Sequence, residues 1–106
     1  MKANHIGLIA ASILLGAWSA TAQQDAKDTY LDKCAVCHGA DGSGKTAKGR
    51  KLKVKDVRET VSKMSPEEMA NIVEKGKGAD MDAYGKQLSK PQIQAVVDYY
   101  RGLAKK

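Results

Sequence analysis

The spacing of apolar residues predicts three helices after residue 22. The first covers residues 25–35, where charged residues alternate and apolar ones recur at every fourth position. The second and third begin at Ser65 and Ser89, because each serine precedes a proline in the first turn and a Glu or Gln three positions on, the pattern of a capping box. Apolar residues then recur at helical spacing up to Gly76 and Leu103.

The segments between these helices carry turn residues instead of a helical period. Four glycines mark residues 39–49 as a long irregular stretch, and the basic run Lys48–Lys55 is interpreted as a solvated loop. Residues 56–63 can form a brief helix, and residues 77–88 form a loop. Because no alternating run is long enough for a strand, the sequence predicts an all-α fold of three to four short helices with long loops.

The first 22 residues have the three parts of a secretory signal peptide. A basic start precedes an apolar run that ends at Trp18, and small residues close the stretch at Ala22. The apolar run is shorter than the roughly 20 residues that span a bilayer as a helix. We therefore expect a cleaved signal peptide over 1–22, a domain over 23–106, and a periplasmic location with no membrane span after cleavage. An uncleaved anchor is the alternative.

Composition bounds the size of the core. At 106 residues the chain has room for one domain, and beyond Ala22 it contains no Trp and no Phe. Domains of this size bury only about 60% of the surface that their unfolded chains expose, and below about 80 residues they usually need an additional staple. We therefore expect something other than large side chains to fill the core.

The same composition excludes several classes of function. Residues 23–106 hold two Cys and one His, so a zinc site with four such ligands is not available within one chain. The formal net charge of +6 comes with few interleaved aromatic residues, so we expect no nucleic-acid partner. No glycine-rich phosphate loop follows a strand-like run.

One five-residue segment, Cys34-Ala-Val-Cys37-His38, carries the chemistry. Two thiols three positions apart on a helical turn, followed at once by an imidazole, are the attachment pattern of c-type haem. Each thiol adds to one haem vinyl group, and His38 can then ligate the iron. A structural or redox disulfide between Cys34 and Cys37 is the alternative. In thioredoxin-like proteins, however, strands surround such a motif, and this sequence predicts none.

The candidates for the second iron ligand are the methionines, because His38 is the only histidine in residues 23–106 and a second histidine ligand from this chain is excluded. Met69 lies on the apolar face of its helix, which indicates a core residue, and Met64 precedes the helix cap, where a hydrophobic staple is expected. Met81 stands between two aspartates in a flexible loop, with no evident packing partner. We therefore expect Met81 as the distal ligand, and an open or weakly ligated iron is the alternative.

The chain resembles the class I c-type cytochromes, small bacterial proteins with one haem, over nearly its whole length after the signal. The matching stretches are residues 34–44, 81–85 and 94–103. The resemblance implies a cytochrome c fold wrapped around one covalently bound haem c. It places thioether bonds at Cys34 and Cys37, the proximal iron ligand at His38 and the distal ligand at Met81.

The resemblance also implies that the first and last helices cross. Tyr30 is then expected near Tyr99, and Ala26 close to the last helix. Family members often have Gly where this chain has Ala26, and Pro where it has Asp82.

Family members commonly hold the proximal histidine through a hydrogen bond from its ring N–H to a proline carbonyl in the loop after the motif. This chain has no proline between His38 and Pro66. A carbonyl near Thr46 or Ala47 is therefore expected to accept the N–H.

Ligation on both faces leaves the iron no vacant site for oxygen or a substrate, which favours electron transfer over catalysis. The sequence thus predicts a monomeric periplasmic one-electron carrier, not an enzyme, whose partners are redox proteins. Its lysine excess suits partners with acidic docking surfaces. A dedicated haem subunit or electron donor of a periplasmic dehydrogenase or reductase is the second hypothesis, and an open-site haem enzyme or gas sensor is the third.

Overall fold

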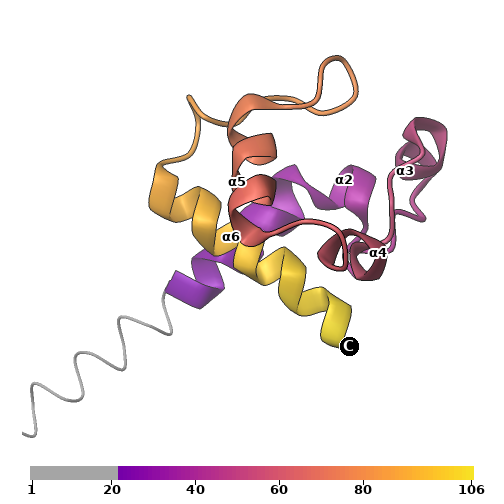
Figure 1. Ribbon diagram of the computed structural model, residues 1–106, viewed down its shortest axis with the longest axis horizontal. Helices are drawn as coiled ribbons and strands as arrows, with labels where there is room; N and C mark the ends of the chain where they lie inside the picture. The colour runs from indigo at the N-terminus through magenta and orange to yellow at the C-terminus, as the bar shows by residue number, and fades with distance from the viewer. Residues whose placement is uncertain (1–21) are drawn as a thin grey trace, which may run out of the picture.

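The computed structural model describes residues 22–106, and every regular element in them is helical (Figure 1). Residues 77 and 81 form an isolated bridge, and the described part of the chain contains no strand. The all-α prediction is confirmed, with more helical segments than the three to four expected. In chain order these are a helix over 22–33, α2 (Ala35–His38), α3 (Ala47–Leu52), α4 (Val57–Val61), α5 (Pro66–Lys75), α6 (Lys90–Gly102) and the 3-10 turn η1 (Leu103–Lys105).

The two long helices after the motif begin where the sequence predicts. The Ser65 hydroxyl accepts from the backbone N–H of Glu68 at 3.1 Å, and the Glu68 carboxylate accepts from the Ser65 N–H at 3.0 Å. Ser89 and Gln92 form the same reciprocal pair, at 3.3 and 2.7 Å. Both capping boxes satisfy amide groups that would otherwise lack partners at the start of α5 and α6.

Helix α3 contradicts the prediction of a solvated loop over Lys48–Lys55. Thr46 caps it by accepting from the Gly49 N–H at 2.9 Å, and Lys53 ends it in the left-handed region, with φ 59°. The charged residues of α3 point to solvent, so the helix has no apolar face by which a sequence pattern could reveal it. Helix α4 confirms the brief helix expected within residues 56–63.

Helix α6 joins two buried clusters of side chains. One cluster consists of Tyr30, Val57, Val96 and Leu103. The other consists of Met69, Leu88, Ile93 and Val97. Since α6 contributes to both, it is the element around which the domain is packed, and Figure 1 shows it crossing the middle of the molecule.

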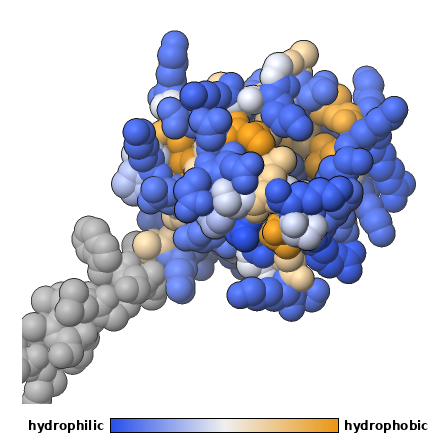
Figure 2. Space-filling view, in the orientation of Figure 1, coloured by the Kyte–Doolittle hydropathy of each residue, from blue (hydrophilic) through white to orange (hydrophobic). Residues whose placement is uncertain are grey.

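The predicted crossing of the first and last helices is confirmed at the tyrosines. The rings of Tyr30 and Tyr99 lie with centroids 5.3 Å apart. Ala26 is buried, with 6% of its surface exposed. Figure 2 shows a mainly hydrophilic face in which apolar residues are visible in small gaps between charged ones.

Two expectations concern the N-terminal region. The predicted signal peptide over 1–22 lies outside the described residues except for Ala22, so its cleavage stays a prediction. Within residues 22–106, none of the helices has the length and apolar character needed to cross a membrane.

Candidate haem-attachment site

The Cys-x-x-Cys-His segment folds into a single tight helical turn. Cys34 stands at the N-cap of α2, and its carbonyl accepts from the N–H groups of Cys37 and His38, at 3.2 and 3.0 Å. This turn places the two thiols on neighbouring positions of one helix face. Neither cysteine is in a disulfide, and both are half-buried. The geometry fits a planar group attached through one edge.

The surroundings of Cys34 do not resemble a redox-active thiol site. Its side chain packs against the cluster that contains Tyr30 and Leu103. Burial raises the pKa of the Cys34 thiol to about 11; Cys37 adds to the increase, and Lys33 partly opposes it. Reactive thiols in Cys-x-x-Cys motifs instead have lowered pKa values. The absence of strands in the described region also disagrees with a thioredoxin-like site.

His38 is held as a neutral imidazole with one unpaired nitrogen. Burial lowers its pKa, so the uncharged form prevails at neutral pH. Its Nδ1 is buried and has no hydrogen-bond partner among the described residues. Leaving a buried polar atom unpaired costs about 1–3 kcal/mol, so a hydrogen-bond partner for this nitrogen would be expected. A neutral imidazole is the form that ligates iron, so this residue fits a haem ligand.

No acceptor for the His38 Nδ1 is found among residues 22–106. The Thr46 carbonyl instead accepts from the Arg50 N–H at 2.9 Å, inside α3. The Thr46 hydroxyl donates to the carbonyl of Val36 at 2.7 Å. The prediction of a carbonyl near Thr46 or Ala47 is therefore wrong, because the segment is helical and uses its own carbonyls.

Helix α3 is fixed directly to the motif turn. A Cβ added at Gly49 would overlap the carbonyl oxygens of Cys37 and Gly44, so only glycine allows this approach. The Gly44 N–H donates to the His38 carbonyl at 2.8 Å. No apolar pattern in the sequence predicts this contact. The signal that could have found it is the threonine three positions before Gly49, an N-cap pattern.

Met81 lies in a loop that is held by the end of α5. The Lys77 N–H donates to the Met81 carbonyl at 2.9 Å, and a Cβ at Gly76 would come within 2.7 Å of the same oxygen. Gly76 itself has φ 77°, which glycine adopts readily. The Tyr84 N–H donates to the Val73 carbonyl at 2.9 Å. These contacts hold the backbone of the loop at Met81 and at Tyr84, and the flexibility expected of the loop stays a prediction.

The structure brings the Met81 loop to the motif through Tyr84. The Tyr84 hydroxyl donates to the Lys33 carbonyl at 3.3 Å, and the Lys33 ammonium donates to Gln87 at 3.4 Å. Met81 is half-buried, and no bond between it and His38 is found in the described part of the chain. The loop thus lies beside the motif, and ligation by Met81 stays a prediction.

The other two methionines are packed into the second core cluster. Met69 is buried, as the sequence indicates, and Met64 packs against the same cluster at the N′ position, where a hydrophobic staple belongs. Arg101 donates to the Met64 carbonyl at 2.9 Å and contacts the Met69 sulfur at 3.6 Å. Both side chains are committed to the α5–α6 contact.

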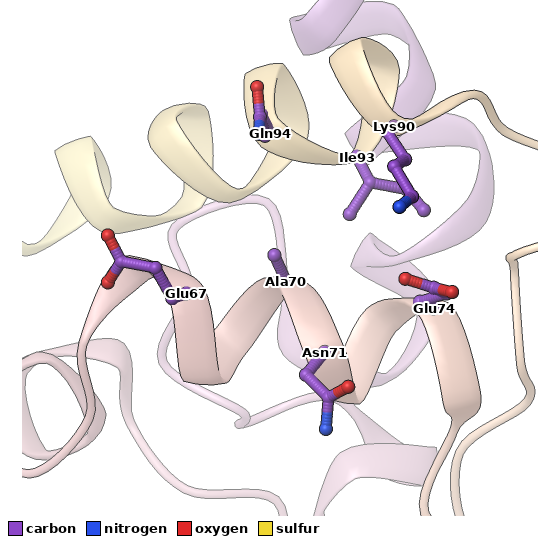
Figure 3. Close-up of a pocket in the computed structure, with 7 residues that line it drawn as sticks. All are labelled: Glu67, Ala70, Asn71, Glu74, Lys90, Ile93 and Gln94. Atoms are coloured by element: carbon purple, nitrogen blue, oxygen red, sulfur yellow. The ribbon is translucent and has the colours of Figure 1, made fainter.

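Two hollows in the described surface are not lined by the residues of the motif. Figure 3 shows the one between α5 and α6, which holds about 220 Å³. The other, of about 450 Å³, lies between the loop after the motif, α4 and the end of α6. Neither is lined by Cys34, Cys37, His38 or Met81, so neither is the attachment site.

An all-helical domain built around a Cys-x-x-Cys-His turn defines a c-type cytochrome, and the comparisons agree. Residues 21–99 match the family described as cytochrome C oxidase, cbb3-type, subunit III. This match spans most of the chain, so the chain belongs to this family of cytochrome c domains. Haem-based electron transfer and redox partners are thereby implied, and such cytochromes are typically electron carriers.

A similar solved structure is also a c-type cytochrome. The protein named KustC0563 c-type cytochrome is similar to this chain with a TM-score of 0.68 and 28% sequence identity. The similarity covers 73% of this chain and 94% of that one. No curated protein matches this chain.

Proposed function

We propose that this protein is a periplasmic one-electron carrier with a single haem c. Cys34 and Cys37 form the thioether bonds, His38 is the proximal iron ligand and Met81 is the distal one. The observation that carries the proposal is the one-turn motif, which places two thiols that are not in a disulfide and a half-buried imidazole within five residues. The bound haem supplies one-electron exchange between ferric and ferrous iron.

The chain's residues have three tasks in this function. The two cysteines keep the haem attached to a domain that is too small to enclose it by packing alone. His38 and Met81 would hold the iron, and a methionine ligand would raise its reduction potential. The contacts of Gly76 with the Met81 carbonyl support this role, because they define where the backbone of the ligand loop lies.

A dedicated haem subunit of a larger enzyme is the second candidate function. The family description names a subunit of an oxidase, and this observation favours an assembly. The similarity to 94% of a c-type cytochrome chain favours a protein that acts as a separate carrier. Purification from the native periplasm separates the two: a carrier elutes as a monomer, whereas a subunit elutes with its enzyme.

Export through the signal peptide over 1–22 is part of the same proposal. Haem c attachment requires delivery of the chain to the compartment where the maturation machinery works. Mass spectrometry of the periplasmic product should give a chain that begins at Gln23 and carries the mass of one haem. A product that retains residues 1–22 would instead support a membrane anchor.

The first test is the visible spectrum of the protein expressed with cytochrome c maturation factors. We expect a c-type spectrum, and the haem should stay with the polypeptide after denaturation because it is covalently bound. The ferric protein should show the weak far-red band of methionine sulfur on iron. Met81→Ala should lose this band and bind carbon monoxide in the ferrous state.

Met64→Ala is the matched control, because Met64 is also half-buried but packs in the core. It should keep the far-red band and exclude carbon monoxide. A wild-type protein without the band would contradict ligation by Met81 and support an open-site enzyme or gas sensor. A product without haem would contradict haem attachment and support a disulfide between Cys34 and Cys37.

A further inference from the structure

The unpaired Nδ1 of His38 leaves open what sets the orientation of this imidazole. A ligand histidine is usually oriented by a hydrogen bond from its second ring nitrogen. No such acceptor is found in the described residues. Instead, one tyrosine contacts the imidazole ring and another bonds the backbone of the next residue, Gly39.

Tyr30 holds the backbone on the C-terminal side of His38. Its hydroxyl donates to the Gly39 carbonyl at 2.6 Å, in a buried hydrogen bond. Tyr30 is 1% exposed, so water does not compete for this bond. Gly39 is the residue after His38 and ends α2 with φ 84°. The hydroxyl therefore connects the first helix to the turn that carries the ligand.

Tyr100 contacts the imidazole itself. The rings of His38 and Tyr100 have centroids 5.1 Å apart and planes at 70°, an edge-to-face arrangement that aromatic rings favour. Tyr100 also lies 5.9 Å from Tyr30, with nearly parallel rings. The imidazole, the two tyrosines and the Gly39 carbonyl thus form one connected set.

We propose that the Tyr30 hydroxyl and the Tyr100 ring are the positioning groups that fix the plane of the His38 imidazole, in place of a hydrogen bond to its Nδ1. This inference rests on the proposed role of His38 as the proximal ligand. The hydroxyl fixes the backbone of the motif turn, and the ring restricts rotation of the imidazole. Neither residue exchanges a proton or an electron in this role.

The test uses the haem-loaded protein and two spectroscopic readouts. The principal g values of a low-spin ferric haem, measured by electron paramagnetic resonance, depend on the plane of an axial imidazole. The reduction potential reports the same ligand environment. We expect Tyr30→Phe and Tyr100→Leu each to shift the g values or to broaden the signals from which they are read, because each removes one constraint on the His38 imidazole.

Two conservative variants separate positioning from packing. Tyr100→Phe keeps the ring and should preserve the wild-type g values, in contrast to Tyr100→Leu. Tyr99→Phe also removes a hydroxyl from the tyrosine cluster, but Tyr99 is in ring contact with Tyr30 and not with His38. It should change neither the g values nor the potential. Chemical denaturation of each variant shows how much stability it loses, independently of the spectra.

Wild-type g values and potential in folded Tyr30→Phe and Tyr100→Leu would overturn the inference and leave both residues as core packing only. Such a result would not affect the proposed function, which fails only if the wild-type protein carries no haem or lacks His38 ligation. If Tyr100→Leu does not fold, Tyr30→Phe decides the question alone, because it removes one oxygen and leaves the ring in place.

Discussion

Single residues in this domain act mainly by fixing the backbone near the motif. Gly49 allows α3 to approach the Cys37 carbonyl, and Gly76 allows the Met81 loop to approach α5. Tyr30 holds the Gly39 carbonyl. None of these three residues carries reactive chemistry, yet each determines where a residue with such chemistry lies.

Gly49→Ala should destabilise the protein, because the new methyl group would meet the Cys37 and Gly44 carbonyls. Overpacking of this kind typically lowers the free energy of unfolding by about 1–3 kcal/mol. Urea denaturation measures the change. Gly102→Ala is the control, since it is also a helical glycine but has open space around it. It should be neutral or stabilising, because alanine is favoured over glycine in a helix by up to about 1 kcal/mol. Equal stability of the two variants would contradict a close contact at Gly49.

We expect Asp56 to contribute to the free energy of unfolding in a way that depends on pH. Hydrogen bonds from the Arg58 side chain and backbone lower the pKa of its carboxyl group to about 2. The ordinary value in an unfolded chain is about 3.9. Because the folded-state pKa is lower, the carboxylate stabilises the fold above the unfolded value, and this stabilisation is lost as the pH falls through the folded value.

Asp56→Asn should therefore remove part of the acid sensitivity between about pH 4 and pH 2. Urea denaturation of both proteins at several pH values in this range measures the difference. The gap in stability between wild type and variant should narrow as the pH falls. A gap that stays constant with pH would mean that the charge of Asp56 contributes nothing.

At the scale of elements, the sequence predicts those helices whose signals are local. Ser65 and Ser89 begin α5 and α6 as expected, because capping is decided by residues within one turn. Helix α3 was missed, because it is held by a backbone contact at Gly49 that no apolar pattern reveals. The backbone hydrogen bonds at Met81 and Tyr84 were missed for the same reason.

In the candidate site, too, the sequence predicts the features that depend on neighbouring residues and not those that depend on distant contacts. The thiols and His38 follow from five consecutive residues, and the fold and the comparisons agree with them. The partner of Nδ1 was predicted wrongly, because it depends on whether residues 46–47 are helical. Met69 and Met64 were correctly assigned to the core, since their place relative to the α5 cap is visible in the sequence.

Ser89→Ala should weaken α6, the helix that joins both core clusters. Loss of a serine N-cap typically costs about 1 kcal/mol of stability, within a range of about 0.5–2 kcal/mol. Thermal or urea unfolding measures this loss. Ser89→Asp retains a capping oxygen and should keep most of the wild-type stability. If Ser89→Ala unfolds like the wild type, the cap does not limit the stability of α6.

At the scale of the whole molecule, positive charge gathers beside the attachment site. The basic segment, residues 45–55, contains no Asp or Glu, and its cationic side chains are exposed. Its helix, α3, packs on α2, which contains Cys37 and His38. Charge in this position acts on a partner that approaches the haem, so it affects the rate of association more than the affinity.

This effect is tested by the rates at which a small anion and a small cation oxidise the reduced protein. The rate with hexacyanoferrate(III), an anion, should fall as the salt concentration rises, because salt screens the attraction. Lys48→Glu/Lys51→Glu should slow this reaction and accelerate oxidation by tris(phenanthroline)cobalt(III), a cation. Lys27→Glu/Lys90→Glu changes the net charge equally but leaves the basic segment intact, and should have a smaller effect. Equal effects of the two double variants would show that only the total charge matters.

The packing of Cys34 against residues of α6 and η1 has a consequence for the order of events during biosynthesis. Cys34 packs against the cluster of Tyr30, Val57, Val96 and Leu103, and the last two of these lie more than 60 positions further along the chain. A ribosome or an export channel releases the motif well before these residues, so the thiols stay accessible until the C-terminal helix docks. If haem c is attached as proposed, the slow closure of this long loop would leave Cys34 open to the attachment reaction for a period before the C-terminal helix docks. A chain that folded from its N-terminus onwards would offer no such period.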